Sequence, residues 1–252
     1  MRGTAITSEL VGHVAKVEVH RPPHNWFDIP VMTELADTIL AVDDIPECRA
    51  VVLCTEGKNF CAGADLAGSG IVEETARLYE QAVRLFSNRK PIVAAVQGAA
   101  VGGGLGLALV ADFRVATPET RFSCNFARLG FHHGFGISVT LPPVVGQQRS
   151  LELMYTGRPV RGEEAFAIGL ADRLAPTDDL RGVTQAFAEE IAESAPLALL
   201  AIRDTMRRDL AARVRAATER EQGEQQRLRV TDDFREGVEA TTERRPPQFT
   251  GR

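Results

Sequence analysis

Short apolar runs and helical patterns alternate through the first half of the chain. Residues 50–54 and 92–96 are unbroken apolar runs that predict buried β-strands, and a third strand is predicted around 113–116. An earlier segment, 14–20, alternates valines with polar residues before a proline-rich loop, which predicts another strand. Residues 31–42 place apolar side chains at helical spacing. Strands that alternate with helices in this way predict an α/β fold.

The last quarter of the chain has a different pattern. Residues 185–244 contain no strand-like run and are rich in Ala, Arg, Glu and Gln. Three helices fit this stretch, with one break at Ala195-Pro196 and another near residues 230–232. Thr231 or Asp232 is expected to cap the final helix.

The bulk composition limits the class of protein. The chain has 252 residues, 44% of them hydrophobic, which is enough to bury a sizeable core without disulfides or metals. Its net charge of −5 argues against nonspecific nucleic-acid binding. The four cysteines form no C-x-x-C pair, so no metal site is expected. No apolar run is long enough for a membrane span and no signal peptide is recognisable, so we expect a cytoplasmic protein.

A glycine-rich segment, Gly98–Gly106, lies between the strand at 92–96 and a predicted helix. Glycines let backbone N–H groups approach a ligand closely, and a helix N-terminus adds partial positive charge. These features predict a site for an anion or a developing oxyanion. A nucleotide-binding loop is an alternative, but G-x-G-x-x-G would need glycine at Leu107, and no lysine follows for a P-loop. Close packing of the helix on a sheet is another alternative.

A second segment of small residues, Lys58–Leu66, follows the strand at 50–54. Its sequence N-F-C-A-G-A-D-L, followed about forty residues later by V-Q-G-A-A-V-G-G-G-L, resembles the paired signature of the enoyl-CoA hydratase/isomerase (crotonase) family. Further segments resemble the family in the same order, from about residue 10 to residue 250. These are 21–25, 111–116, 153–157, 165–171, 233–238 and 244–249.

The resemblance implies a fold, an assembly and a substrate class. Family members form a spiral of ββα turns with a C-terminal helical region that packs in trimers, so we expect this α/β, crotonase-like architecture. The core with its acyl-CoA site would span residues 1–194, and the helical region would span 195–252. A homotrimer, or a homohexamer built as a dimer of trimers, is expected. The substrates would be acyl-CoA thioesters of fatty acid metabolism, with no separate cofactor.

The resemblance also assigns residues to the site. The backbone N–H groups of Ala62 and Gly103 are expected to form an oxyanion hole that binds the thioester oxygen and stabilises an enolate. Prepositioned donors favour the transition state over the ground state because negative charge develops on that oxygen. The residues expected to contact the substrate are Pro23, His24, Ala62, Gly63, Ala64, Asp65, Leu66, Gly102, Gly103 and Phe126.

The positions where family members carry acid–base residues hold Gly106, Phe126 and Gly134. None of these side chains can transfer a proton, which argues against the standard addition of water by two glutamates. His132 and His133 are nearby substitutes because histidine titrates near neutral pH, and His133 is slightly preferred. The alternative is that these histidines cap a helix or face an interface.

Three functions are compatible with this pattern. The first is a lyase or isomerase that acts on acyl-CoA with nonstandard acid–base groups. The second is another reaction through the same enolate-like state, such as thioester hydrolysis or decarboxylation. The third is a noncatalytic acyl-CoA binder. The acyl group itself depends on how residues 68–79 and 131–140 pack, which the sequence does not specify.

Overall fold

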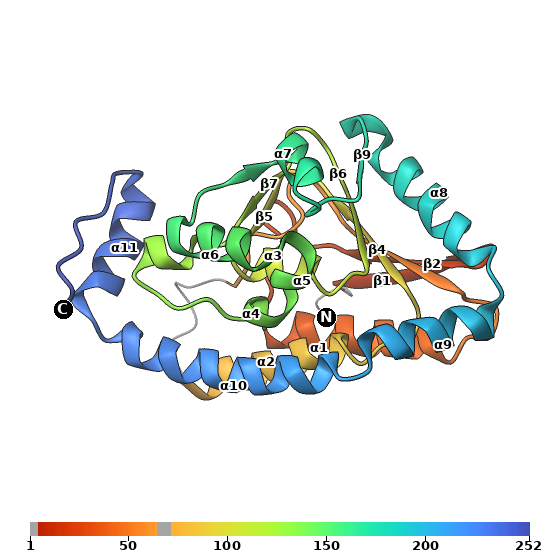
Figure 1. The fold of residues 1–252 in the computed structure, drawn as a ribbon, viewed down its shortest axis with the longest axis horizontal. Helices are drawn as coiled ribbons and strands as arrows, with labels where there is room; N and C mark the ends of the chain where they lie inside the picture. The colour runs from red at the N-terminus through yellow and green to blue at the C-terminus, as the bar shows by residue number, and fades with distance from the viewer. Residues whose placement is uncertain (1–4, 65–71) are drawn as a thin grey trace.

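A computed structural model describes residues 5–64 and 72–252, so the predicted substrate contacts Asp65 and Leu66 lie outside the described residues. Two β-sheets form the framework (Figure 1). The larger sheet has six strands in the order β1 (Ile6–Val11), β2 (Val14–Val19), β3 (Ala50–Thr55), β4 (Ile92–Val96), β6 (Phe113–Ala116) and β9 (Arg173–Leu174). The smaller sheet has three strands in the order β5 (Ala99–Val101), β7 (Arg121–Ser123) and β8 (Val160–Arg161).

The six-stranded sheet is parallel except at one edge, where β1 and β2 form an antiparallel hairpin. Every residue of β3 and β4 is buried. This burial explains their unbroken apolar sequences, because a parallel strand that is covered on both faces has no solvent side. The parallel arrangement also brings the loops that follow β3 and β4 to the same edge of the sheet. Both segments of small residues lie in these loops.

Helices cover both faces of the larger sheet. On one face, α1 (Ile29–Asp43) packs against β1 and β2 and against α2 (Val72–Leu85). The Asp28 side chain caps α1 by accepting a hydrogen bond from the Val31 N–H at 3.0 Å. On the other face, α8 (Leu180–Ala192) packs against β3 and β4 (Figure 1). Short helices connect the two sheets to the rest of the chain: α3 (Gly103–Ala108), η1 (Asn125–Leu129), α4 (Ile137–Thr140), α5 (Pro142–Val145), α6 (Gln147–Thr156), α7 (Gly162–Ala167) and η2 (Thr177–Asp179).

Three helices follow α8: α9 (Pro196–Arg207), α10 (Leu210–Arg229) and α11 (Asp232–Glu243). The two predicted breaks are confirmed, since α9 begins at Pro196 and the Thr231 side chain caps α11 by accepting from the Phe234 N–H at 3.2 Å. A further break between α9 and α10 was not predicted, so residues 185–244 hold four helices, counting the end of α8, and not three. α10 packs along α2 and also contacts α4 (Figure 1). A helix from the last quarter of the chain therefore packs against a helix from its first third. None of the helices within residues 5–64 and 72–252 is both long and apolar enough to cross a membrane.

Candidate active site

The two segments of small residues lie directly against each other. The Cys61 N–H donates to the Ala99 carbonyl oxygen at 2.9 Å, and the Val101 N–H donates to the Cys61 carbonyl oxygen at 3.0 Å. A Cβ on Gly104 would lie only 2.0 Å from the Cys61 carbonyl oxygen, so the backbones approach too closely for any side chain there. Backbone hydrogen bonds therefore fix the position of one loop against the other.

Two backbone N–H groups are left without a partner at this junction. Gly103 is the first residue of α3, and its N–H makes no hydrogen bond among the described residues; neither does the N–H of Ala64. A Cβ on the intervening Gly63 would lie 3.3 Å from the Gly103 nitrogen, which shows how close the two loops come here. Ala64 and Gly103 line the same pocket. Both N–H groups thus belong to residues of one pocket, on two loops that lie against each other.

The structure corrects the predicted role of Ala62. Its N–H already donates to the His24 carbonyl oxygen at 2.9 Å, so it is not available to a thioester oxygen. The next N–H, that of Gly63, faces the Cys61 sulfur at 3.3 Å. Ala64, which was predicted to contact the substrate, lines the pocket, and its N–H makes no hydrogen bond among the described residues.

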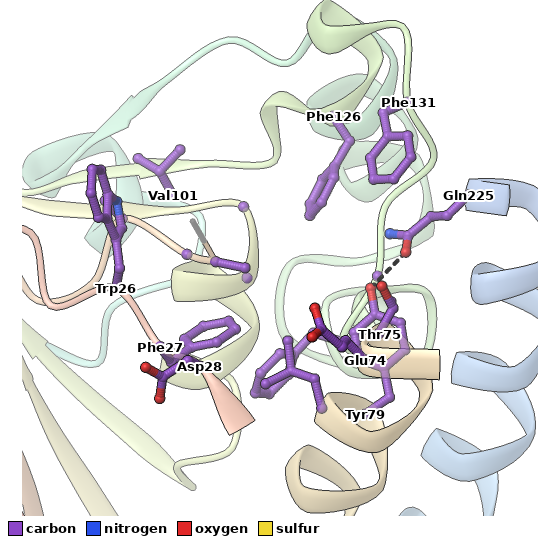
Figure 2. Close-up of a pocket in the computed structure, with 18 of the residues that line it drawn as sticks. Trp26, Phe27, Asp28, Glu74, Thr75, Tyr79, Val101, Phe126, Phe131 and Gln225 are labelled. Atoms are coloured by element: carbon purple, nitrogen blue, oxygen red, sulfur yellow. Dashed lines mark hydrogen bonds between the residues drawn. The ribbon is translucent and has the colours of Figure 1, made fainter. Parts of the chain in front are cut away.

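The pocket has a volume of about 450 Å³. Figure 2 shows Trp26 and Phe27 on one side, Phe126 and Phe131 on another, and Glu74, Thr75 and Tyr79 from α2 facing them. The polar side chains that line it are Arg21, Asp28, Glu74, Thr75, Tyr79, Asn125, Gln225 and Arg229, and the large apolar ones are Trp26, Phe27, Ile29, Leu78, Val101, Phe126, Leu129, Phe131 and Phe135. The pocket therefore combines a largely apolar wall with several polar side chains and the loops that carry Ala64 and Gly103.

Aromatic side chains fill the space around the vacant acid–base positions. A Cβ on Gly106 would lie 2.6 Å from Phe135, whose ring stands where a longer side chain would project. A Cβ on Gly134 would lie 1.8 Å from the Tyr79 hydroxyl oxygen. Phe126 itself lines the pocket. The two glutamates are thus absent, and the room for one of them is occupied.

The Tyr79 hydroxyl is held by residues from other elements. It donates to Gln225 Oε1 at 2.9 Å, and Gln225 Nε2 donates to the His132 carbonyl oxygen at 3.0 Å (Figure 2). Burial is the main reason that the pKa of Tyr79 is raised above its ordinary value of 10. The phenol therefore keeps its proton at neutral pH.

The predicted acid–base pair, His132 and His133, does not reach the pocket, since neither is among the described residues that line it. His133 Nε2 is buried 3.6 Å from Glu221 Oε1 and has no hydrogen-bond partner among the described residues. Burial, together with the charge of His132, lowers the pKa of His133 to about 4. His133 is therefore neutral at pH 7 and packs behind the pocket wall against α10.

The remaining predicted contacts divide into two groups. Ala62, Gly63, Ala64, Gly102, Gly103 and Phe126 all line the pocket. Pro23 and His24 do not line it among the described residues, but the His24 ring stacks on Trp26 with their centroids 4.8 Å apart. Trp26, 40% exposed, does line the pocket, so His24 acts on its rim through that contact.

Glu74, Tyr79 and Gln225 were not predicted. Tyr79 and Gln225 are 146 residues apart and belong to two helices whose packing no local motif signals. Within residues 5–64 and 72–252, no group of three or more His, Cys, Asp or Glu side chains is arranged to hold a metal ion.

Comparison with known proteins agrees with this geometry. The sequence model of the enoyl-CoA hydratase/isomerase family matches residues 9–252. The chain belongs to this family. A Thermus thermophilus protein assigned as an enoyl-CoA hydratase is 38% identical over 263 residues, covering 94% of this chain and 98% of that protein. A Mycobacterium tuberculosis relative with the same kind of assignment is 33% identical over 272 residues, covering 98% of this chain and 94% of that protein.

Solved structures of other family members confirm the crotonase fold class. The enoyl-CoA hydratase/isomerase from Pseudoalteromonas atlantica superimposes with a TM-score of 0.86 at 29% identity, covering 98% of this chain and all of that one. An enoyl-CoA hydratase from Mycobacterium avium also gives 0.86, at 28% identity, covering 99% and 100% of the two chains. The trimer or hexamer stays a prediction.

Proposed function

We propose that this family member binds an acyl-CoA thioester and holds its carbonyl oxygen between the N–H groups of Ala64 and Gly103. The observation that carries the proposal is a pair of amides that have no hydrogen-bond partner in the described part of the chain and lie on two loops that backbone hydrogen bonds fix together. When the α-carbon loses a proton, negative charge moves to that oxygen, and both donors then bind it more strongly. Loss of one such donor typically costs about 3–4 kcal/mol of transition-state stabilisation.

The acid–base group that we propose is Glu74. Asp28, another pocket-lining carboxylate, caps α1 and accepts from Arg21 Nη1 at 3.1 Å. Glu74 also lines the pocket, and among the described residues it makes no ion pair or hydrogen bond. In the proposed step its carboxylate accepts the α-proton, and the electron pair of the C–H bond moves into the enolate. Return of the proton to the γ-carbon of an enoyl group would complete an isomerisation.

One carboxylate without its partner suits proton transfer better than the addition of water, which in this family uses two glutamates. We therefore favour an isomerase-type reaction over hydration. Coenzyme A would be part of the substrate, so the proposal needs no separate cofactor. Fatty acid metabolism, a cytoplasmic setting and assembly as a homotrimer or homohexamer belong to the same proposal, and light scattering of the purified protein tests the assembly.

A backbone substitution separates the two candidate donors. Lactic acid incorporated at position 64 replaces that N–H by an ester oxygen, and the same change at position 62 is the matched control. With the native protein we expect the absorption band of bound cinnamoyl-CoA to move to longer wavelength, because the donors polarise its carbonyl. The ester at Ala64 should remove most of this shift. The ester at Ala62 should keep it while lowering stability by about 1 kcal/mol.

No shift with the native protein would contradict the oxyanion hole altogether. Loss of the shift only with the ester at Ala62 would return the donor role to that residue.

Proton transfer is tested by deuterium exchange at the α-carbon of butanoyl-CoA in heavy water. Glu74→Gln should slow the exchange at least 100-fold, a typical contribution of a general base. Glu80→Gln is the control, because Glu80 lies on the same helix and is not among the described residues that line the pocket, and it should leave the exchange unchanged. Exchange that survives in Glu74→Gln would exclude Glu74. Release of free coenzyme A or carbon dioxide would favour hydrolysis or decarboxylation, and binding without exchange or turnover would favour a noncatalytic binder.

A further inference from the structure

Tyr79 and Gln225 form a polar pair in the wall of the pocket. Phe126 and Phe131 stand across the space from this pair, and Glu74 and Thr75 lie beside Tyr79 on α2 (Figure 2). Gln225 is buried, only 3% exposed, and Tyr79 is partly buried. Buried polar side chains are costly unless their hydrogen-bonding groups are used, so the groups that stay free indicate what the pocket accepts.

The hydrogen bonds of Tyr79 and Gln225 leave one donor and one acceptor of this pair unused. The phenol O–H donates to Gln225 Oε1 at 2.9 Å, which leaves the phenol oxygen at least one lone pair for an acceptor role toward the pocket. One N–H of the Gln225 amide goes to the His132 carbonyl oxygen at 3.0 Å, and the amide carries a second N–H. The pair therefore offers one acceptor and one donor side by side.

The backbone at Gly134 lies directly against Tyr79 and Gln225. A Cβ on Gly134 would lie 1.8 Å from the phenol oxygen and 2.7 Å from Gln225 Nε2. The absence of a side chain at this position thus leaves the space in which both polar groups sit. Three separate elements, α2, α10 and the segment after η1, contribute to the arrangement.

We propose that Tyr79 and Gln225 bind a hydroxyl group carried by the acyl chain of the thioester. This inference rests on the proposed acyl-CoA function and names a substrate class for it. A hydroxyl group donates to the phenol oxygen and accepts from the Gln225 amide, so it uses both free groups. A ketone oxygen would use only the amide and would face the phenol lone pair. An unsubstituted chain would leave both groups unsatisfied.

The order of the hydrogen bonds supports a hydroxyl group. Because the pKa of Tyr79 is raised, the phenol keeps its proton over the neutral range and continues to donate it to Gln225 Oε1. The phenol oxygen is then an acceptor toward the pocket, which suits a hydroxyl and not a ketone. A site that hydrogen-bonds a substrate hydroxyl discriminates strongly against analogues that lack it, because its own polar groups are then left buried and unpaired.

Binding of matched thioesters tests the inference. Dissociation constants are measured by calorimetry for hexanoyl-CoA and for hexanoyl-CoAs that carry a hydroxyl group at carbon 3, 4 or 5. We expect one hydroxylated isomer to bind the native protein at least about tenfold more tightly than hexanoyl-CoA. Tyr79→Phe and Gln225→Met should each reduce this preference to about threefold or less. Gly134→Ala should do the same by displacing the phenol.

The chain contains a matched control, because its second tyrosine, Tyr155, is 74% exposed and lies away from the pocket. Tyr155→Phe should keep the full preference for the hydroxylated thioester. Its affinity for hexanoyl-CoA should also match that of the native protein.

Two results would overturn the inference alone: equal binding of all four thioesters by the native protein, or a preference that persists in both Tyr79→Phe and Gln225→Met. Failure of the native protein to bind any of the four would contradict the proposed function as well as this inference.

Discussion

Substitution of Gly104 by alanine tests how tightly the two donor loops depend on their backbone contact. The new Cβ would lie 2.0 Å from the Cys61 carbonyl oxygen and 2.7 Å from its carbonyl carbon, more than an ångström short of ordinary contact. Relief requires the loops to separate, which breaks the two hydrogen bonds between them, each worth about 1 kcal/mol. Overpacking of a well-packed core adds about 1–3 kcal/mol. We expect a total loss of about 3 kcal/mol or more.

The measurement is urea unfolding of Gly104→Ala together with the absorption shift of bound cinnamoyl-CoA. The shift should disappear because Ala64 and Gly103 no longer face the same atom, and a displacement of about 1 Å is enough to reduce catalysis about 100-fold. Gly223→Ala is the control, since nothing lies within 4 Å of its added Cβ in α10. It should gain about 0.5–1 kcal/mol. Native stability and a native shift in Gly104→Ala would refute the reasoning.

Three further changes have defined outcomes. His133→Asn should leave thioester binding at pH 7 unchanged. Because the folded-state pKa of His133 is lowered from 6.5 to about 4, unfolding takes up a proton below pH 6.5, so the native protein should lose up to about 3 kcal/mol between pH 6.5 and 4, and the variant should show a flatter pH profile. Arg203→Met should cost about 3 kcal/mol in urea unfolding, since the buried Arg203 holds Asp112 at 3.0 Å; a loss below 1 kcal/mol would show that the pair is dispensable. Gly106→Glu should lower the melting temperature without producing crotonoyl-CoA hydration, because Phe135 occupies the space that the glutamate needs.

The elements that could be predicted are those that local physics decides. β3 and β4 are buried on both faces, and their unbroken apolar sequences predict this burial. The helix that begins at Pro196 and the cap at Thr231 also follow from residues at the break itself. The pairing of the two small-residue loops was predictable because parallel strands deliver their following loops to one edge of the sheet.

The choice between Ala62 and Ala64 was not predictable from the sequence of their loop. Both are alanines beside Gly63, and what separates them is the His24 carbonyl oxygen, which takes the N–H of Ala62. That oxygen belongs to a segment almost forty residues earlier, so its position depends on tertiary structure.

The positions of His132 and His133 likewise depend on tertiary structure that their local sequence does not specify. Gly134 and Phe135, which follow His133 directly, line the pocket, but His132 and His133 themselves do not. Both histidines lie against α10, where Glu221 is 3.6 Å from His133 Nε2 and Gln225 donates to the His132 carbonyl oxygen. The Tyr79 hydroxyl group is likewise held by α10, through its hydrogen bond to Gln225. A helix more than eighty residues away along the chain thus contributes to deciding which polar groups line the pocket.

Because main-chain bonds between two loops hold the proposed donors, Ala64 and Gly103, changes of most side chains leave these two amides in place. The carbonyl of any thioester that enters would meet the same two amides, whichever groups line the rest of the pocket. The pocket wall can therefore change its chemistry one side chain at a time without loss of the polarising centre. The chain is therefore a starting scaffold for protein engineering, in which new acid–base pairs can be introduced on α2 and α10. The two backbone hydrogen bonds, from Cys61 to Ala99 and from Val101 to Cys61, would be kept unchanged.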